Sequence, residues 1–196
     1  MNNNKSLSFF RLLFFPPKQD VINIAVEKRN RFVVLIPIIF GIMIGFFKTV
    51  SNYDSANIEY WYGLLVSNII SSILLTLVGV FLYVLLVQFL SSMFKGISNY
   101  KMTFTMFSYS LIPVIIGWLL ISVISMIMML YPIKYTNAIT LIDVRNIIQR
   151  IFMLYGIIIL VRGVGIINQF SIIKALISSV GLIILLLIIG FFQQMV

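Results

Sequence analysis

The chain has 196 residues, of which 61% are hydrophobic and only 10% are charged. A soluble domain of this length carries about 25% charged residues, so the composition excludes a soluble fold and predicts one polytopic membrane domain. The formal net charge of +9 does not predict a nucleic-acid-binding protein, because the basic residues flank apolar segments instead of forming a clustered basic surface. The absence of Cys and His excludes thiolate chemistry, Cys/His zinc sites and imidazole catalysis.

Residues 1–31 precede the first segment that could span a membrane. They contain an aromatic patch at residues 9–15, which a Pro-Pro pair ends. Arg11 interrupts this patch and no small-residue cleavage site follows it, so a cleaved signal peptide is not expected. We interpret residues 1–31 as a cytoplasmic, amphipathic segment that lies at the membrane interface.

Five apolar segments follow, and each is interpreted as a transmembrane helix. The first is short and spans only if Lys48 snorkels at its end. Pro113 falls near the start of the third segment, in the first turns of a helix, where Pro is tolerated. The sequence therefore predicts an all-α fold, a polytopic helical bundle with an N-terminal interfacial segment and a five-helix membrane domain at residues 32–196. The predicted spans cover residues 32–48, 64–90, 109–130, 147–167 and 172–192.

The Lys and Arg residues are shared unequally among the segments between these spans. If the N-terminus is cytoplasmic, most of the fourteen basic residues lie on the inner side. Only Lys48, Lys134, Arg145 and Arg150 then lie on the outer side. The positive-inside rule therefore predicts a cytoplasmic N-terminus and a C-terminus outside the cell.

Polar residues occupy the first half of the second predicted span, at Asn68, Ser71, Ser72 and Thr76. Their spacing is typical of contacts between transmembrane helices, which favours a role in packing. A polar path for a transported molecule along the same residues is the alternative interpretation.

A weak internal repeat follows the second and fourth spans. The sequence reads Gly96-Ile97-Ser98-Asn99-Tyr100 after the second span and Gly165-Ile166-Ile167-Asn168-Gln169-Phe170 after the fourth. Each stretch is a Gly-Ile-x-Asn turn followed by an aromatic residue, and each leads into a span that runs outward. The match is either a parallel repeat or chance, and in both cases Gly and Asn suit a tight reversal between two spans.

Residue patterns that would indicate catalysis are absent from the sequence. All five carboxylates lie outside the predicted spans, whereas ion-coupled transporters commonly place an ionisable residue at mid-membrane. We find no Gly-rich phosphate loop, nucleophile elbow or paired carboxylates, and we therefore expect no enzyme activity, cofactor or metal. Arg162, near the end of the fourth span, either snorkels to the inner surface or contacts a phosphate or a partner there.

Several stretches of the chain resemble the Yip family of membrane proteins, whose eukaryotic members interact with Rab-type GTPases. They are Pro16-Pro17, residues 94–104 with the Tyr109-to-Pro113 step, and residues 160–163 with the Ser-x-x-Lys-Ala step at 171–176. The resemblance implies five spans with the N-terminus inside. Residues 1–31 lack the Asp-Leu-Tyr-Gly-Pro-like motif of eukaryotic members. The composition rich in Asn, Ile and Lys is typical of a bacterial member, which would place the chain in the plasma membrane.

We expect a non-enzymatic accessory or scaffold subunit that acts through partner membrane proteins, such as an ABC-type exporter, or through lipids. The alternative is a small transporter or lipid-translocating protein. The expected partners are anionic lipid headgroups at the inner surface and a membrane protein or a second copy of the chain, without nucleic acid. The candidate contact residues are Arg162, Asn68, Ser71, Ser72, Thr76, Lys95, Lys101, Asn99, Asn168 and Lys174.

Overall fold

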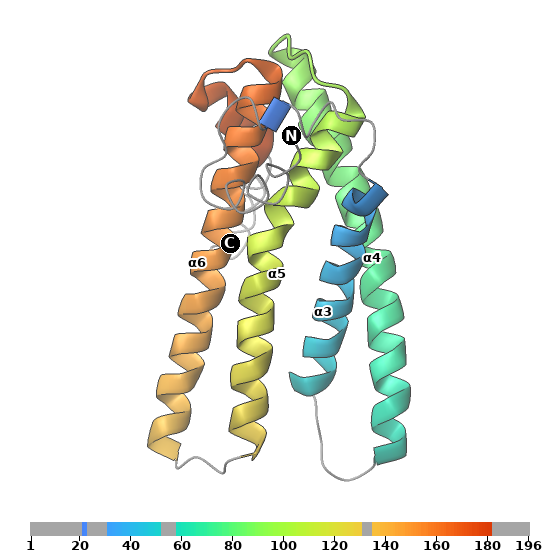
Figure 1. Cartoon of the computed structure of the whole chain (residues 1–196), viewed down its shortest axis with the longest axis vertical. Helices are drawn as coiled ribbons and strands as arrows, with labels where there is room; N and C mark the ends of the chain where they lie inside the picture. Colours follow the sequence, from blue (N-terminus) through green and yellow to red (C-terminus); the bar gives the residue numbers. More distant parts are fainter. Residues whose placement is uncertain (1–20, 23–30, 52–57, 131–134, 182–196) are drawn as a thin grey trace, which may run out of the picture. The chain divides into compact units, whose positions relative to one another are not determined.

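The computed structural model describes residues 21–22, 31–51, 58–130 and 135–181. Every element among them is helical, which confirms the all-α prediction for the described part of the chain (Figure 1). A 3-10 helix, η1 (Arg31–Val34), runs into α3 (Leu35–Ser51). The remaining helices are α4 (Ile58–Met93), α5 (Tyr100–Leu130), α6 (Tyr135–Asn168) and a last helix at Ile172–Gly181.

Three helical stretches are long and apolar enough to cross a membrane, namely Trp61–Met93, Tyr100–Ile124 and Val144–Asn168. Two shorter apolar helices, Leu35–Thr49 and Ile172–Gly181, lie at the first and last predicted spans. Residues 182–192 of the last predicted span lie outside the described residues. The structure thus supports a polytopic helical membrane protein with three long apolar helices, and the count of five spans stays a prediction.

Helix α5 corrects the predicted position of Pro113. The helix begins at Tyr100 and continues without a break to Leu130, with Pro113 inside it. Pro113 therefore lies more than three turns from the start, and its ring removes the hydrogen bond that the carbonyl of Tyr109 would accept. The prediction failed because residues 100–108, polar in part, continue the helix. The Thr105 hydroxyl donates back to the Lys101 carbonyl at 2.8 Å.

The chain divides into two compact units, which we describe separately. Unit 1 comprises Met1–Asn30, Phe81–Tyr109 and Ile157–Val196, and unit 2 comprises Arg31–Val80 and Ser110–Gly156. The boundary between the units falls inside α4, α5 and α6, so each of these helices contributes residues to both units.

Unit 2 is held together by glycines at which two helix backbones meet. A Cβ atom built on Gly45 of α3 would lie 2.5 Å from the Ile69 Cα of α4, and one on Gly41 would lie 2.7 Å from the Ile73 Cα. A Cβ on Gly156 of α6 would lie 2.7 Å from the Ser110 carbonyl oxygen of α5. Because no side chain fits at these positions, the helices approach more closely than larger residues would allow.

Among the described residues of unit 1, buried apolar side chains form three small clusters. Val87 of α4 packs with Leu160 and Val164 of α6, bordered by Tyr83 and Phe107. Two further clusters extend this core to the N-terminal segment and to the last helix. They comprise Val21 with Met106 and Ile167, and Val161 with Ala175 and Val180.

Candidate functional site

Two short turns at one end of unit 1 form the candidate site (Figure 1). Turn A, residues 94–99, joins α4 to α5, and turn B, residues 169–171, joins α6 to the last helix. We call the two turns together the paired turns.

Turn A ends α4 with a Schellman motif, in which two backbone N–H groups fold back onto the last helical turn. The Gly96 N–H donates to the Ser91 carbonyl at 2.8 Å, and the Lys95 N–H donates to the Ser92 carbonyl at 2.9 Å. Lys95 has a φ of 62°, in the left-handed region that glycine normally occupies.

Turn B ends α6 in the same way. The Phe170 N–H donates to the Gly165 carbonyl at 2.8 Å and the Gln169 N–H to the Ile166 carbonyl at 3.3 Å. Gln169 has a φ of 57°. The turns are therefore alike in their backbone, with Lys95 equivalent to Gln169 and Gly96 equivalent to Phe170.

This equivalence shows that the register suggested by the sequence repeat is wrong. The repeat aligns Gly96 with Gly165, but Gly165 lies inside α6 whereas Gly96 follows α4. The two Asn residues also differ in role. Asn168 is the last residue of α6, whereas Asn99 caps the start of α5, where its side-chain oxygen accepts from the Met102 N–H at 2.9 Å.

Asn168 holds the two turns together. Its side chain is buried, its Oδ1 accepts the Ser98 N–H of turn A at 2.9 Å, and its Nδ2 donates to the Val164 carbonyl at 3.1 Å. A Cβ atom on Gly96 would overlap Asn168 Oδ1 and lie 2.9 Å from the Phe170 ring. The hydrogen bond therefore depends on Gly96 having no side chain.

An aromatic contact reinforces this connection. The rings of Phe94 in turn A and Phe170 in turn B have centroids 6.2 Å apart and are nearly perpendicular, at 82°. Edge-to-face pairs of this kind contribute about 0.5–1.5 kcal/mol beyond the area they bury. Together with the Asn168 hydrogen bonds, they make the paired turns one connected structure.

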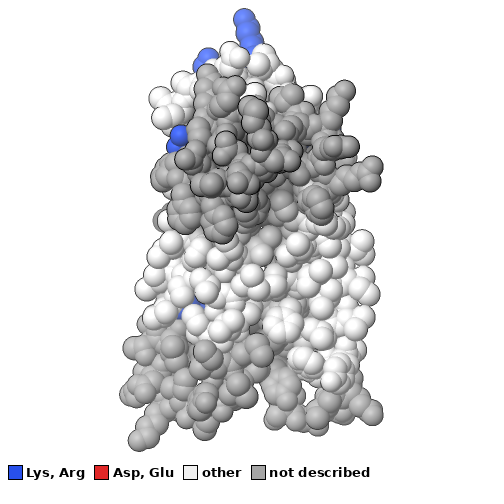
Figure 2. All heavy atoms as spheres, viewed as in Figure 1, with Lys and Arg blue, Asp and Glu red and all other residues white. Residues whose placement is uncertain are grey.

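Basic side chains surround the paired turns. The described Lys and Arg residues of unit 1 are all exposed, and no Asp or Glu side chain is among those that the structure describes. In Figure 2 the described surface on the side in view is mostly white, with Lys and Arg in a few places. The four basic residues of unit 1 are Lys95 in turn A, Lys101 at the start of α5, Lys174 at the start of the last helix, and Arg162 within α6.

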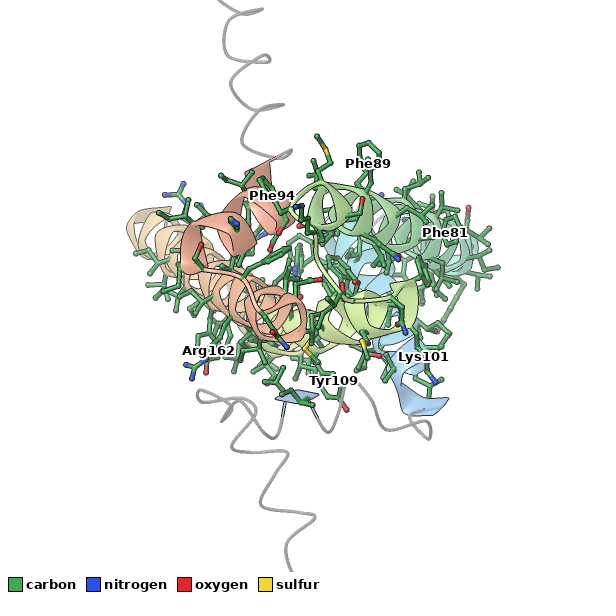
Figure 3. The ribbon with its side chains drawn as sticks, turned by 90° about the horizontal axis from the view of Figure 1, so that it is seen from above. Phe81, Phe89, Phe94, Lys101, Tyr109 and Arg162 are labelled. Carbon is green, nitrogen blue, oxygen red and sulfur yellow. The ribbon has the colours of Figure 1, made fainter. Side chains whose placement is uncertain are left out.

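Arg162 stands apart from the three lysines. It lies six residues before the end of α6, about 9 Å along the helix axis. Seen from above in Figure 3, Arg162 and Lys101 extend on different sides of the unit. Among the described basic residues of unit 1, Lys95 lies in turn A, and Lys101 and Lys174 lie in the first turns of the helices that follow turns A and B, whereas Arg162 lies within α6.

The predicted polar residues of α4 belong to unit 2 and contact α3 or their own helix. The Asn68 side chain donates to the Thr49 hydroxyl at 3.1 Å, and that hydroxyl donates to the Gly45 carbonyl at 3.0 Å. Ser71 is exposed and donates to the Asn68 carbonyl at 3.2 Å. Ser72 is buried, with no hydrogen-bond partner for its hydroxyl among the described residues, and Thr76 is partly buried.

The candidate residues predicted from the sequence therefore form two groups. Asn68, Ser71, Ser72 and Thr76 lie in unit 2, and Lys95, Asn99, Lys101, Arg162, Asn168 and Lys174 lie in unit 1. Gly41 and Gly45 were not among the predicted contact residues, although Gly-x-x-x-Gly is a known signal for close helix contacts. The contact between Phe94 and Phe170 was also not predicted, and no spacing rule would have paired them.

Within the described residues, no three His, Cys, Asp or Glu side chains come together as metal ligands would. The protein-family model described as Yip1 domain matches residues 11–192 of the chain. No curated protein and no solved structure matches the chain.

Proposed function

The chain belongs to the Yip1 domain family, and we propose that it is a non-enzymatic accessory or scaffold subunit for partner membrane proteins or lipids. The family match and the three long apolar helices establish a membrane protein. We further propose that the chain resides in the plasma membrane of a bacterium with its N-terminus in the cytoplasm. Its partners would be subunits of an ABC-type exporter or a second copy of the chain.

The observation that carries this proposal is the pair of connected turns in a molecule whose helices expose broad apolar faces. Large apolar side chains are exposed along α4, among them Val66, Leu74, Val78 and Phe89. In a membrane such faces contact lipid tails or other helices. The paired turns add a fixed polar surface, so the described features suit a protein that works through contacts.

The contacts of α4 favour packing over a transport path. The Asn68 side chain donates a hydrogen bond to the Thr49 hydroxyl of α3. Gly41 and Gly45 bring α3 against the α4 backbone at Ser72–Ile73 and Asn68–Ile69. A polar path would need these side chains to face an open, hydrated space. The hydrogen bond from Asn68 to Thr49 and the close α3–α4 backbone approach instead support the accessory role over the small transporter or lipid-translocating protein.

Purification in mild detergent tests the proposal. The tagged chain is expected to recover a defined membrane protein, or a second differently tagged copy, in a constant ratio. A monodisperse monomer without a partner would contradict it.

Purified protein in vesicles with a fluorescent phospholipid tests the alternative. We expect the lipid to change leaflets no faster than in protein-free vesicles, and faster transfer would support lipid translocation.

A further inference from the structure

We propose that the paired turns bind the headgroups of anionic phospholipids. This inference rests on the proposed contact function and names the lipid class that one of its surfaces takes. The surface consists of three lysines and three isoleucines, and we call it the basic turn surface. Its residues are Lys95, Ile97, Lys101, Ile172, Ile173 and Lys174.

The charge of this surface is of one sign. All three lysines are exposed, and the sequence on either side of the two turns, residues 91–109 and 163–181, contains no Asp or Glu. Each Lys near an anionic bilayer contributes an attraction that multiplies the affinity for an anionic headgroup severalfold. Three lysines on neighbouring turns therefore favour anionic over neutral headgroups.

Two of the lysines lie where a helix disfavours positive charge. Lys101 is the second residue of α5 and Lys174 is the third residue of the last helix. The first turn of α5 contains no acidic residue. The start of a helix carries partial positive charge from its free N–H groups. A bound anion would offset this repulsion, which points to a negatively charged ligand.

Exposed isoleucines show that the anion belongs to a bilayer. Ile97 is 67% exposed, Ile172 82% and Ile173 70%. Exposure of this extent in water is unfavourable at roughly 25 cal/mol for each Å² of apolar surface. Apolar side chains interleaved with lysines are typical of segments that sit at the headgroup level of anionic membranes. A free phosphate ion would use the lysines but not the isoleucines.

The connection between the turns gives the surface a fixed arrangement. Lys95 and Ile97 lie in turn A, whereas Ile172 and Ile173 directly follow turn B. The hydrogen bond from the Ser98 N–H to Asn168 Oδ1 and the Phe94–Phe170 contact join the two sides. A surface whose parts are already positioned loses less conformational entropy on binding.

Fluorescence quenching by brominated lipids measures the proposed preference. The chain contains no Cys, so Met93→Cys introduces a single labelling site. Met93 is exposed and is the last residue of α4, beside turn A. The labelled full-length protein is placed in nanodiscs containing a fixed fraction of phosphatidylglycerol or phosphatidylcholine, each brominated near the headgroup end of its acyl chains. The ratio of the two quenching efficiencies reports the preference.

We expect phosphatidylglycerol to quench several times more strongly than phosphatidylcholine. K95Q/K101Q/K174Q should bring the ratio close to one, and K95R/K101R/K174R should keep it. K48Q/R150Q, which removes exposed basic residues of unit 2, is the matched control and should also keep it. The inference is wrong if the ratio is near one before substitution, if the Gln variant keeps it, or if K48Q/R150Q lowers it equally.

Two further outcomes identify other ligands or separate this inference from the proposed function. Displacement of phosphatidylglycerol by a soluble oligoglutamate peptide at low concentration would assign the surface to an acidic protein segment and overturn the lipid inference. The unsubstituted chain is also purified in mild detergent. If it recovers a partner but its quenching ratio is near one, the inference is wrong while the proposed function stands.

Discussion

The close contact between α3 and α4 in unit 2 and the paired turns in unit 1 use the same kinds of residue in different arrangements. In both, a glycine lies where two segments of the chain meet, and an Asn side chain makes a hydrogen bond. In unit 2, Gly41 and Gly45 meet the backbone of α4, and Asn68 binds a Thr hydroxyl. In unit 1, Gly96 makes room for Asn168, which binds a backbone N–H.

The difference lies in what surrounds each contact. Around the unit 2 contact, α3 and α4 expose apolar residues such as Ile39, Ile42 and Val66, as expected of helices in hydrocarbon. Exposed lysines lie close in sequence to the unit 1 contact, with Lys95 in turn A and Lys101 and Lys174 in the helices that follow the two turns. A glycine with an asparagine thus serves helix packing in unit 2 and joins the two turns in unit 1.

Gly45→Val should have the largest effect on stability, because it breaks the contact between α3 and α4 in unit 2. Gly45→Val places a branched side chain where even a Cβ would lie 2.5 Å from the Ile69 Cα. Backbone atoms cannot give way as a flexible side chain can, so the helices must separate. We expect the free energy of unfolding in detergent to fall by about 3 kcal/mol, measured by denaturant titration of helical circular dichroism.

Gly79→Val is the matched control for this substitution. Gly79 lies on α4, and a Cβ there would meet nothing within 4 Å. It should change the free energy of unfolding by less than about 1 kcal/mol. Equal losses for the two variants would contradict the close contact between α3 and α4.

A smaller loss is expected when the paired turns are disconnected. Asn168→Ala leaves the Ser98 N–H without its acceptor, and burial makes this loss cost about 2 kcal/mol. Denaturant titration measures the change, and Gln169→Ala at the exposed neighbouring position is the control. If Asn168→Ala were as mild as the control, the hydrogen bond would not connect the turns.

The smallest effect is a gain in stability. Gln169 has a φ of 57°, a conformation that Gly adopts without the steric cost that other residues carry. Gln169→Gly should therefore raise the free energy of unfolding by about 1 kcal/mol. Ser92→Gly, at an exposed position in the last turn of α4, should instead lower it by about 0.5 kcal/mol. A loss from Gln169→Gly would show that turn B does not have this backbone conformation.

Hydropathy predicted the helical class because long apolar runs in a chain with few charges can satisfy their backbone groups only as helices. Boundaries were harder to predict. The predicted span began at Tyr109, but α5 begins at Tyr100, where the Asn99 side chain caps the helix nine residues before the apolar run.

The candidate site was predicted only in part. Lys95, Lys101, Lys174 and both Asn residues were identified as contact candidates, because polar residues between spans or at the start of a span stand out against an apolar background. Their arrangement could not be predicted. Residue identities in the sequence repeat aligned Gly96 with Gly165, whereas the backbone hydrogen bonds align Gly96 with Phe170. A Schellman motif built on Lys and Gln instead of Gly leaves no sequence signature.

The central claim is that the connection between the turns positions the lysines for anionic lipid, and the quenching ratio in two Asn variants tests it most directly. Asn168→Ala removes the connection in unit 1, and Asn68→Ala removes the hydrogen bond to Thr49 in unit 2. Both variants keep every lysine. The account predicts that Asn168→Ala lowers the preference for phosphatidylglycerol and that Asn68→Ala leaves it unchanged. An unchanged ratio in Asn168→Ala, or an equal fall in both variants, would contradict it.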